Sequence, residues 1–258
     1  MTVIGVDIGG TGIKGAPVDV RRGALIAERV RLLTPESKKP DDMLGVIAEI
    51  VGRFESPTCL GVTFPGVVMG GVIRTAANLD KSWIGVDLAA LVRDRMGLHV
   101  TAINDADAAA VAEGAHGAAK RVRGVVIMLT FGTGVGSGLL LDGKLVPNTE
   151  LGHLEMNGKD AEKIVAEVVR EKKKLSWKKW SERTNEYLAL IEELFSPDLI
   201  VIGGGIDRSN DKWLPLLKAR APIKVATLGN NAGIVGAAMV AQHTLPRPTA
   251  SGRRVDSG

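Results

Sequence analysis

The chain has 258 residues, which is enough for one large domain or two modest ones with sizeable cores. Apolar residues make up 45% of it, charged residues 24%, and there are 32 glycines, a balance that is typical of a globular α/β protein and excludes a disordered or fibrous chain. The net charge of +4 is compatible with a polyanionic partner without requiring one.

The first part of the chain predicts a β-hairpin followed by alternating strands and helices. Residues 3–8 and 13–20 are β-rich runs on either side of Gly9-Gly10-Thr11-Gly12, which indicates a hairpin with a glycine-rich turn. Asp41-Asp42 is placed to cap an amphipathic helix. The other expected elements are strands over 25–33, 59–64 and 100–103, a helix over 86–96, and an alanine-rich helix over 105–117.

The second part repeats the opening pattern of strand, glycine turn and strand. Residues 124–130 and 135–141 flank Phe131-Gly132-Thr133-Gly134, and the backbone amides of both turns can hold phosphate oxygens. We therefore expect two lobes that face one another. The remaining expected elements are a charged helical region over 160–193, a strand over 199–202 that runs into Gly203-Gly204-Gly205, and a helix over 231–243.

The sequence carries no signal for export or for membrane insertion. The first strand-like run begins at residue 2 with no basic leader before it, and no stretch approaches about 18 uninterrupted apolar residues. The single cysteine, Cys59, can form neither an internal disulfide nor a multi-cysteine metal site. We expect a cytoplasmic protein without a membrane partner.

Asp7 ends the first strand, and Lys14 follows the first glycine turn, which comprises residues 9–12. Backbone amides in such a turn approach phosphate closely, and Asp7 can hold a hydrated metal ion or its waters. The alternative is a plain hairpin turn. The spacing matches neither a Walker loop nor a dinucleotide-binding fingerprint, because a strand and not a helix follows the turn.

Asn104-Asp105 stands where a strand gives way to a helix. Asp at such a place is most often a helix N-cap, which is one interpretation. The other is a carboxylate that points from a strand end into a cleft and accepts the proton of an attacking hydroxyl. This motif alone leaves both interpretations open.

Three side chains that can hydrogen-bond a polyhydroxy ligand are concentrated in Glu150-Leu151-Gly152-His153-Leu154-Glu155. The same side chains suggest a metal site, but no cysteine accompanies them and the strong zinc spacings are missing. We therefore favour sugar contact over metal ligation. A solvated turn with a structural histidine is the remaining alternative.

Taken in order, these motifs resemble the ROK family of sugar kinases and repressors over nearly the whole chain. The resemblance implies an α/β, two-lobed actin-like ATPase or ribonuclease-H-like fold, in which sugar and phosphoryl donor meet in an interlobe active-site cleft. It implies a first lobe over 1–117 that is completed by a helix over about 231–245, a second lobe over 118–230, and a disordered tail over 246–258.

The resemblance also assigns roles to residues. Asp105 is the expected catalytic base, and Mg²⁺ is the expected cofactor, held by Asp7 through water. The residues expected to bind the sugar are Asn78, Asn104, Asp105, Glu150, His153 and Glu162. The residues expected to bind phosphate are Gly9, Gly10, Thr11, Gly12, Lys14, Gly132, Thr133 and Gly134.

Two departures from the family pattern narrow these expectations. Many ROK proteins carry a Cys-x-Cys-Gly-x-x-Gly-Cys zinc loop after the histidine, whereas residues 154–162 contain no cysteine, so we expect no structural zinc. Without that loop the last sugar-binding glutamate is Glu162 or, as the competing choice, Glu155. ROK repressors begin with a helix-turn-helix domain, and this chain opens on a strand, so we expect neither a DNA-binding regulator nor a nucleic-acid partner.

Within the family the sequence is most similar to the compact actinobacterial polyphosphate glucokinases. The similar stretches are 7–15, 63–68, 77–83, 146–155, 175–177 and 230–238. This similarity implies a homodimer that transfers the terminal phosphoryl group of inorganic polyphosphate to the 6-hydroxyl of glucose, with ATP or mannose accepted by some members. An ATP-dependent glucokinase or glucomannokinase is the alternative, and it needs an adenine pocket near residues 203–205. A non-catalytic sugar-binding protein is the third hypothesis, and it does not need Asp105.

A polyphosphate donor carries repeated negative charge and no base or ribose, so its recognition relies on cationic side chains and backbone amides. Besides Lys14, the candidate contacts are Arg74, Lys81, Lys120, Arg121 and Lys144, each of which is also an ordinary surface position. The lysine-rich run over 172–179 is typical of an exposed helix face, and it can also guide a long polyanion toward the cleft.

Overall fold

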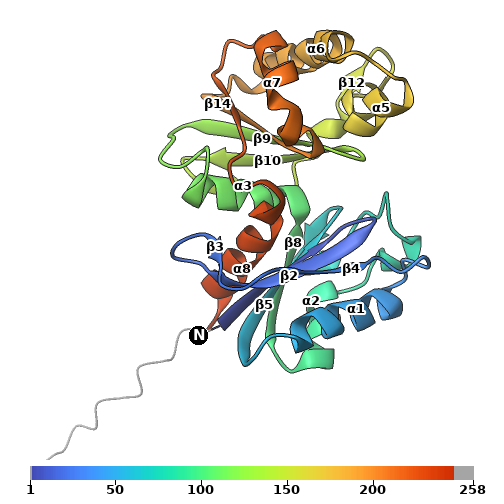
Figure 1. Cartoon of the computed structure of the whole chain (residues 1–258), viewed down its shortest axis with the longest axis vertical. Coiled ribbons are helices and arrows are strands. Elements are labelled where there is room, and N and C mark those ends of the chain that lie inside the picture. The colour runs from blue at the N-terminus through green and yellow to red at the C-terminus, as the bar shows by residue number, and fades with distance from the viewer. Residues whose placement is uncertain (1, 247–258) are drawn as a thin grey trace, which may run out of the picture.

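The structure is a computed structural model that describes residues 2–246, apart from the side chains of Asp207 and Arg208. Two β-sheets lie one above the other in Figure 1, and helices α3 (Asp105–His116) and α8 (Ala232–Thr244) lie between them. The expected two-lobed α/β architecture is confirmed. From residue 247 onward, the expected disordered tail lies outside the described residues. Within residues 2–246, no helix is both long and apolar enough to cross a membrane.

The sheet of the first lobe has the strand order β3-β2-β1-β5-β8, and β4 also pairs with β2. Its strands are β1 (Thr2–Ile8), β2 (Gly12–Asp19), β3 (Ala24–Leu25), β4 (Val30–Leu33), β5 (Pro57–Phe64) and β8 (His99–Asn104). β1 pairs antiparallel with β2, whereas β1, β5 and β8 run parallel. The carboxyl ends of the parallel strands therefore meet at one edge, where Asp7 lies beside Thr63 and Phe64 beside Asn104.

Helices cover both faces of this first sheet. On one face, α1 (Pro40–Gly52) and α2 (Leu88–Met96) share a buried apolar cluster with β1 and β5. On the other face, α8 crosses β1 and β5 at very short range. A Cβ atom at Gly5 would collide with the carbonyl oxygen of Ile234, and one at Gly61 with that of Ala237. The two strand glycines therefore let the helix backbone lie directly on the sheet.

The sheet of the second lobe has the strand order β11-β10-β9-β14-β15. Its strands are β9 (Val125–Phe131), β10 (Val135–Leu141), β11 (Lys144–Val146), β14 (Leu199–Gly204) and β15 (Ile223–Val225). β9 pairs antiparallel with β10 and parallel with β14, as β1 does with β2 and β5. The second glycine turn (residues 132–134) therefore lies at the same sheet edge as Gly204, which pairs with Phe131.

Long and short helices cover the second sheet. α6 (Trp177–Phe195) buries Trp180, Tyr187, Leu188 and Ile191 in the apolar cluster of this lobe. The shorter helices of the same lobe are α4 (Glu162–Val165), α5 (Glu167–Lys172) and α7 (Asn210–Trp213). The remaining strands form the small hairpins β6 (Val68–Met69) with β7 (Val72–Ile73) and β12 (Glu155–Met156) with β13 (Lys159–Asp160).

The structure corrects two expectations in the first lobe. The strand expected over 25–33 is split into β3 and β4, because residues 26–29 leave the sheet and Arg29 hydrogen-bonds Asn231, 2.9 Å away on the far segment. Asp41 and Asp42 do not cap α1. The helix starts at Pro40, a residue whose fixed φ suits the first helical position, and both carboxylates lie in the first turn near the positive end of the helix dipole.

The charged region over 160–193 is also not one continuous helix. It contains β13, α4, α5 and α6 in turn. α6 has its own N-cap, because the Ser176 hydroxyl accepts a hydrogen bond from the Lys179 amide at 3.3 Å. Serine at that position starts a new helix, so the periodic pattern on either side of it belongs to separate segments.

Candidate functional site

The facing edges of the two sheets enclose a cleft with a cavity of about 430 Å³. Parallel strands from each lobe deliver their carboxyl ends to it, which is where ligands bind in open α/β sheets. The residues predicted from the sequence that line it are Gly9, Gly10, Thr11, Asn78, Asn104, Asp105, Gly132, Thr133, Gly134, Glu150, His153 and Glu162. Segments far apart in the chain therefore meet at one place.

Asp105 lies at the floor of the cleft in the first turn of α3. The N-cap of that helix is Asn104, whose side-chain oxygen accepts a hydrogen bond from the Asp107 amide at 2.9 Å. The interpretation of Asp105 as a helix cap is therefore wrong. Its carboxylate accepts one hydrogen bond, from the neighbouring Ala106 amide at 2.9 Å, and the rest of it faces the cleft.

The electrostatic surroundings of Asp105 suit a proton acceptor. Burial, the larger cause, and the negative charge of Asp7 together raise its pKa to about 7. A carboxylate with a pKa near the working pH combines adequate ionisation with a strong pull on a hydroxyl proton. Asp105 is thus chemically prepared to act as a general base.

Asn104 fixes the two loops around this carboxylate. Besides capping α3, its amide nitrogen donates a hydrogen bond to the Gly66 carbonyl oxygen at 3.1 Å. One amide hydrogen remains for a ligand, because an asparagine amide carries two. Asn104 can therefore contact a sugar while it holds the strand end in place.

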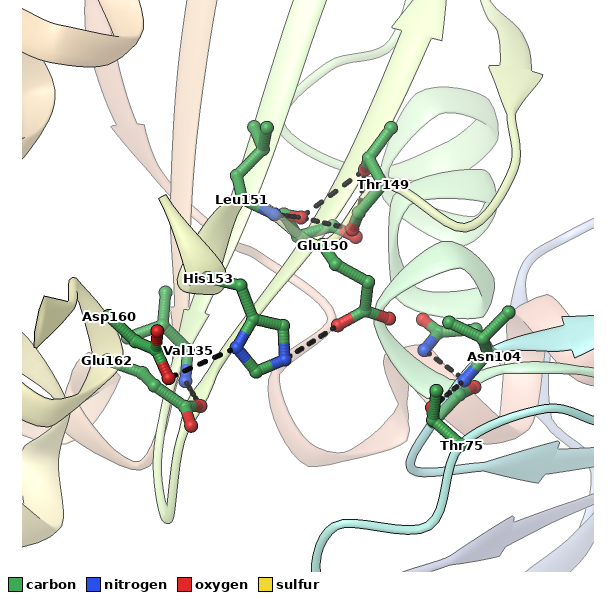
Figure 2. A network of polar contacts seen from close by, with 12 residues as sticks. Thr75, Asn104, Val135, Thr149, Glu150, Leu151, His153, Asp160 and Glu162 are labelled. Carbon is green, nitrogen blue, oxygen red and sulfur yellow. Dashed lines mark hydrogen bonds and ion pairs between the residues drawn. The ribbon is translucent and has the colours of Figure 1, made fainter. Parts of the chain in front are cut away.

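Glu150 and His153 stand on the opposite wall, on a 3-10 turn over Leu151–His153 (Figure 2). The buried Ser137 hydroxyl holds this turn, since it donates to the Thr149 carbonyl and accepts from the Leu151 amide at 2.9 Å. Figure 2 shows the Glu150 carboxylate directed across the cleft toward Asn104. Burial raises the pKa of Glu150, and nearby His153 opposes that rise.

The imidazole of His153 lies between two carboxylates (Figure 2). Its Nε2 atom is 3.9 Å from Glu150, and its Nδ1 atom is 3.6 Å from Asp160. Asp160 is in turn paired with Lys163 at 2.7 Å, and this ammonium group holds the pKa of Asp160 below its ordinary value. Asp160 therefore holds the histidine ring from the side away from Glu150.

Of the two competing glutamates, the structure brings only Glu162 into the cleft. Its carboxylate accepts a hydrogen bond from the Val135 amide at 3.4 Å, next to the second glycine turn. Glu155 is exposed on β12 and does not line the cavity. His153, Asp160 and Glu162 have ligand atoms within 4.8 Å of one another, and the ammonium group of Lys163 already balances part of their charge.

Asp7 and Lys14 form an ion pair of 2.9 Å beside the first glycine turn. Asp7 also accepts a hydrogen bond from the Thr63 hydroxyl at 2.8 Å. Both residues line a smaller cavity of about 140 Å³ that shares Asp105 with the main cleft. Asp7, the residue predicted to hold the metal, and Asp105, the predicted base, therefore line the same small cavity. Lys14 and Gly12, both predicted to bind phosphate, do not line the main cleft.

The other cationic candidates do not line either cavity. Lys120 and Arg121 follow the far end of α3, which is about 18 Å from Asp105 along a helix of 12 residues. Lys144 lies at the far end of β10, about 20 Å from the second glycine turn. Arg74 and Lys81 flank the segment 75–78, part of which lines the cleft.

Sequence reasoning missed three residues around the cleft. Lys38 lines it and donates a hydrogen bond to the Asn78 carbonyl at 3.2 Å. Asp107 is buried and accepts a hydrogen bond from the Asn148 amide at 2.7 Å, which ties α3 to the segment before Glu150. Asp160 is the third. Lys38 stands in an irregular polar stretch, and Asp107 on a helix, so neither position gave a signal by itself.

The chain is similar to known proteins over most of its length. Residues 3–164 match the ROK family. The chain belongs to the ROK family. It is 50% identical over 236 residues to the polyphosphate glucokinase of Mycobacterium tuberculosis (strain CDC 1551 / Oshkosh), which covers 91% of this chain and 89% of that protein.

Solved structures of ROK proteins share the fold. The inorganic polyphosphate/ATP-glucomannokinase from Arthrobacter sp. strain KM superposes with a TM-score of 0.90 and 46% identity, over 94% of this chain and 98% of that one. A ROK family glucokinase from Streptomyces griseus, in complex with glucose and AMPPNP, has a TM-score of 0.82 and 23% identity over 94% and 100% of the chains. The second likeness concerns the fold alone.

Proposed function

We propose that this ROK protein transfers the terminal phosphoryl group of inorganic polyphosphate to the 6-hydroxyl of glucose, giving glucose 6-phosphate. The observation that carries the proposal is the position of Asp105, a carboxylate with a raised pKa between sugar-binding groups and two glycine turns. Polyphosphate as donor and glucose as acceptor are supported by the similarity to the mycobacterial and Arthrobacter enzymes.

The geometry supports a direct, in-line transfer. Glucose docks between Asn78 and Asn104 on one wall and Glu150, His153 and Glu162 on the other, with its 6-hydroxyl toward Asp105. Asp105 takes the hydroxyl proton as the oxygen attacks the terminal phosphorus. The backbone amides of both glycine turns and the ammonium group of Lys14 offset the charge that spreads over the transferred group.

Mg²⁺ is part of the proposal because the chain offers a fitting place for it. The carboxylates of Asp7 and Asp105 line one cavity, and carboxylate oxygens are ligands that suit Mg²⁺. Asp7 would hold the ion through water, as is usual for Mg²⁺ beside phosphates. The bound ion would supply positive charge that offsets the negative charge of the donor's phosphate oxygens.

ATP remains an alternative donor. An adenine pocket for it is expected near residues 203–205, where the Glu167 carboxylate lies beside Gly205. The Arthrobacter enzyme carries both donors in its name. Use of ATP, and of mannose as acceptor, is therefore the second candidate function.

The experiment that tests the proposal is an assay of the purified protein with glucose, Mg²⁺ and either ATP or polyphosphates of several lengths. We expect glucose 6-phosphate with polyphosphate. If glucose 6-phosphate forms with ATP and not with polyphosphate, the proposed donor is wrong, but the protein is still a glucose kinase. Binding of glucose without turnover on any donor would favour the third hypothesis, a sugar-binding protein. A homodimer, expected from the family resemblance, and a cytoplasmic location are also part of the proposal. Size-exclusion chromatography with light scattering tests the dimer.

A further inference from the structure

A lysine-rich loop stands out on the second lobe, outside the cleft. Residues 172–179, called the basic loop below, contain five lysines and no acidic residue. All five lysines are exposed, and within residues 2–246 none of them forms an ion pair. The lysines are Lys172, Lys173, Lys174, Lys178 and Lys179. This unpaired positive charge has no role in the cleft chemistry described above.

The backbone of the basic loop is held in a defined shape. The amides of Lys173, Lys174 and Leu175 donate hydrogen bonds to carbonyl oxygens of α5 at 2.9 to 3.0 Å. Ser176 then caps α6, as described above. The guanidinium of Arg170 lies 4.0 Å above the centre of the Trp177 ring, and this contact joins α5 to the start of α6. The lysines are therefore presented from a fixed surface.

Two connections couple this surface to the second glycine turn. The Val168 amide at the start of α5 donates a hydrogen bond to the Gly132 carbonyl at 3.1 Å. In addition, a row of rings runs from Trp177 to Trp180, with centres 5.7 Å apart, and on to Phe131 at 5.4 Å, the residue before the turn. In Figure 1, α5 lies close to the tips of β9 and β10, where this turn is.

The distance fits a donor longer than its reacting end. α5 has six residues and spans about 9 Å, so the basic loop begins about that far beyond the turn that faces Asp105. Exposed charges still interact over about 8 Å at physiological ionic strength. A phosphate chain whose end lies at the turn can reach the lysines only if it continues well past the reacting phosphates.

We propose that the basic loop binds the distal phosphates of long-chain inorganic polyphosphate. This inference rests on the proposed function and deepens it, because it assigns chain-length preference to a surface separate from the catalytic groups. Nucleic acid is the other polyanion of similar charge. Polyphosphate is favoured because the loop is joined to a turn at the reaction cleft.

The test compares donor lengths in a charge-reversal variant, K172E/K173E/K178E. With long-chain polyphosphate at low salt, kcat/KM should fall at least about tenfold, as expected when electrostatic steering is lost. With tripolyphosphate, kcat/KM should stay within about twofold, and the KM for glucose should not change. Added KCl should shrink the difference between variant and parent, because salt screens exposed charges.

The matched control is R21E/R95E/K218E, which makes the same change in net charge at three exposed positions that do not line the cleft. It should keep full activity with long polyphosphate. An equal loss in the control, or an equal loss with long and short donors in the loop variant, would overturn the inference while leaving the proposed function intact.

Direct binding separates the inference from the proposed function. Fluorescence anisotropy of end-labelled long polyphosphate should show tight binding to the parent protein and at least about tenfold weaker binding to the loop variant, whether or not the protein turns over. Absence of binding to the parent overturns the inference. Duplex DNA at equal phosphate concentration should compete poorly, and equal competition would assign the surface to nucleic acid instead.

Discussion

The two walls of the cleft hold their functional side chains in different ways. On the first-lobe wall, Asp7 and Asn104-Asp105 lie at the ends of paired parallel strands, and backbone register fixes their positions. On the second-lobe wall, Glu150 and His153 stand at the two ends of a short 3-10 turn, and contacts from the Ser137 and Asp160 side chains hold it. The proposed base is thus positioned by the sheet, whereas the proposed sugar contacts of the second lobe are positioned by a few side chains.

Because the two walls are built differently, we expect substitutions on them to have different kinetic effects. Removal of the proposed base, Asp105, from the strand-end wall should lower turnover and leave glucose binding in place. A change among the side chains that support the other wall should raise the KM for glucose with a smaller effect on turnover. The predictions below test this division, from the largest effect to the smallest.

Replacing the base should have the largest effect. In Asp105→Asn the proton acceptor is lost and the shape is kept, so kcat should fall by about 100- to 10,000-fold. Glucose affinity, measured by isothermal titration calorimetry, should change little. Asp94→Asn, at an exposed position on α2, is the matched control and should behave as the parent. Turnover near the parent level in Asp105→Asn would remove this residue from its role.

The pH dependence should report the same group. Asp105 must be ionised to accept a proton, and its pKa of about 7 means that kcat/KM rises about tenfold between pH 6 and pH 8. In Asp7→Asn the acid limb should move to lower pH, since the Asp7 charge contributes to the raised pKa of Asp105. A limb centred near pH 4 in the parent would contradict this account.

Removing the support of His153 should have a moderate effect. Asp160→Asn keeps the size of the side chain and removes the negative charge 3.6 Å from Nδ1 of His153, so the KM for glucose should rise about two- to fivefold, the range for a weak, exposed electrostatic contact. The value of kcat should fall less than KM rises. Lys159→Gln, next to Asp160 and exposed, should leave both constants unchanged. A loss confined to kcat would place Asp160 on the reacting side instead.

The smallest effect concerns stability. Because the pKa of Asp105 is raised in the folded protein, its ionised form costs stability at high pH, and this cost disappears as pH falls from about 7 toward the unfolded value near 4. Asp105→Asn should therefore melt at least about 2 °C above the parent at pH 8, with a smaller difference at pH 5. Differential scanning calorimetry at both pH values measures this.

The division between the walls also explains what the sequence could predict. Asp105 and both glycine turns lie where a regular strand ends, so the local pattern marked their places. Lys38 and Asp160 lie in segments without regular period, and their partners are set by tertiary packing. The break of the 160–193 region is different in part, because Ser176 is a local signal that α6 begins there, whereas the ends of α4 and α5 depend on how those short helices pack on the second lobe.

The close crossing of α3 and α8 has a mechanical consequence. At Gly236 the two backbones touch so closely that a Cβ atom would collide with the Ala108 carbonyl, and Ala108 is about 4.5 Å along α3 from Asp105. α3 packs on the second sheet and α8 on the first. If the lobes rotate about this crossing, Asp105 lies close to the axis of rotation and moves little. The sugar wall and the phosphate turns would swing toward a base that stays nearly still.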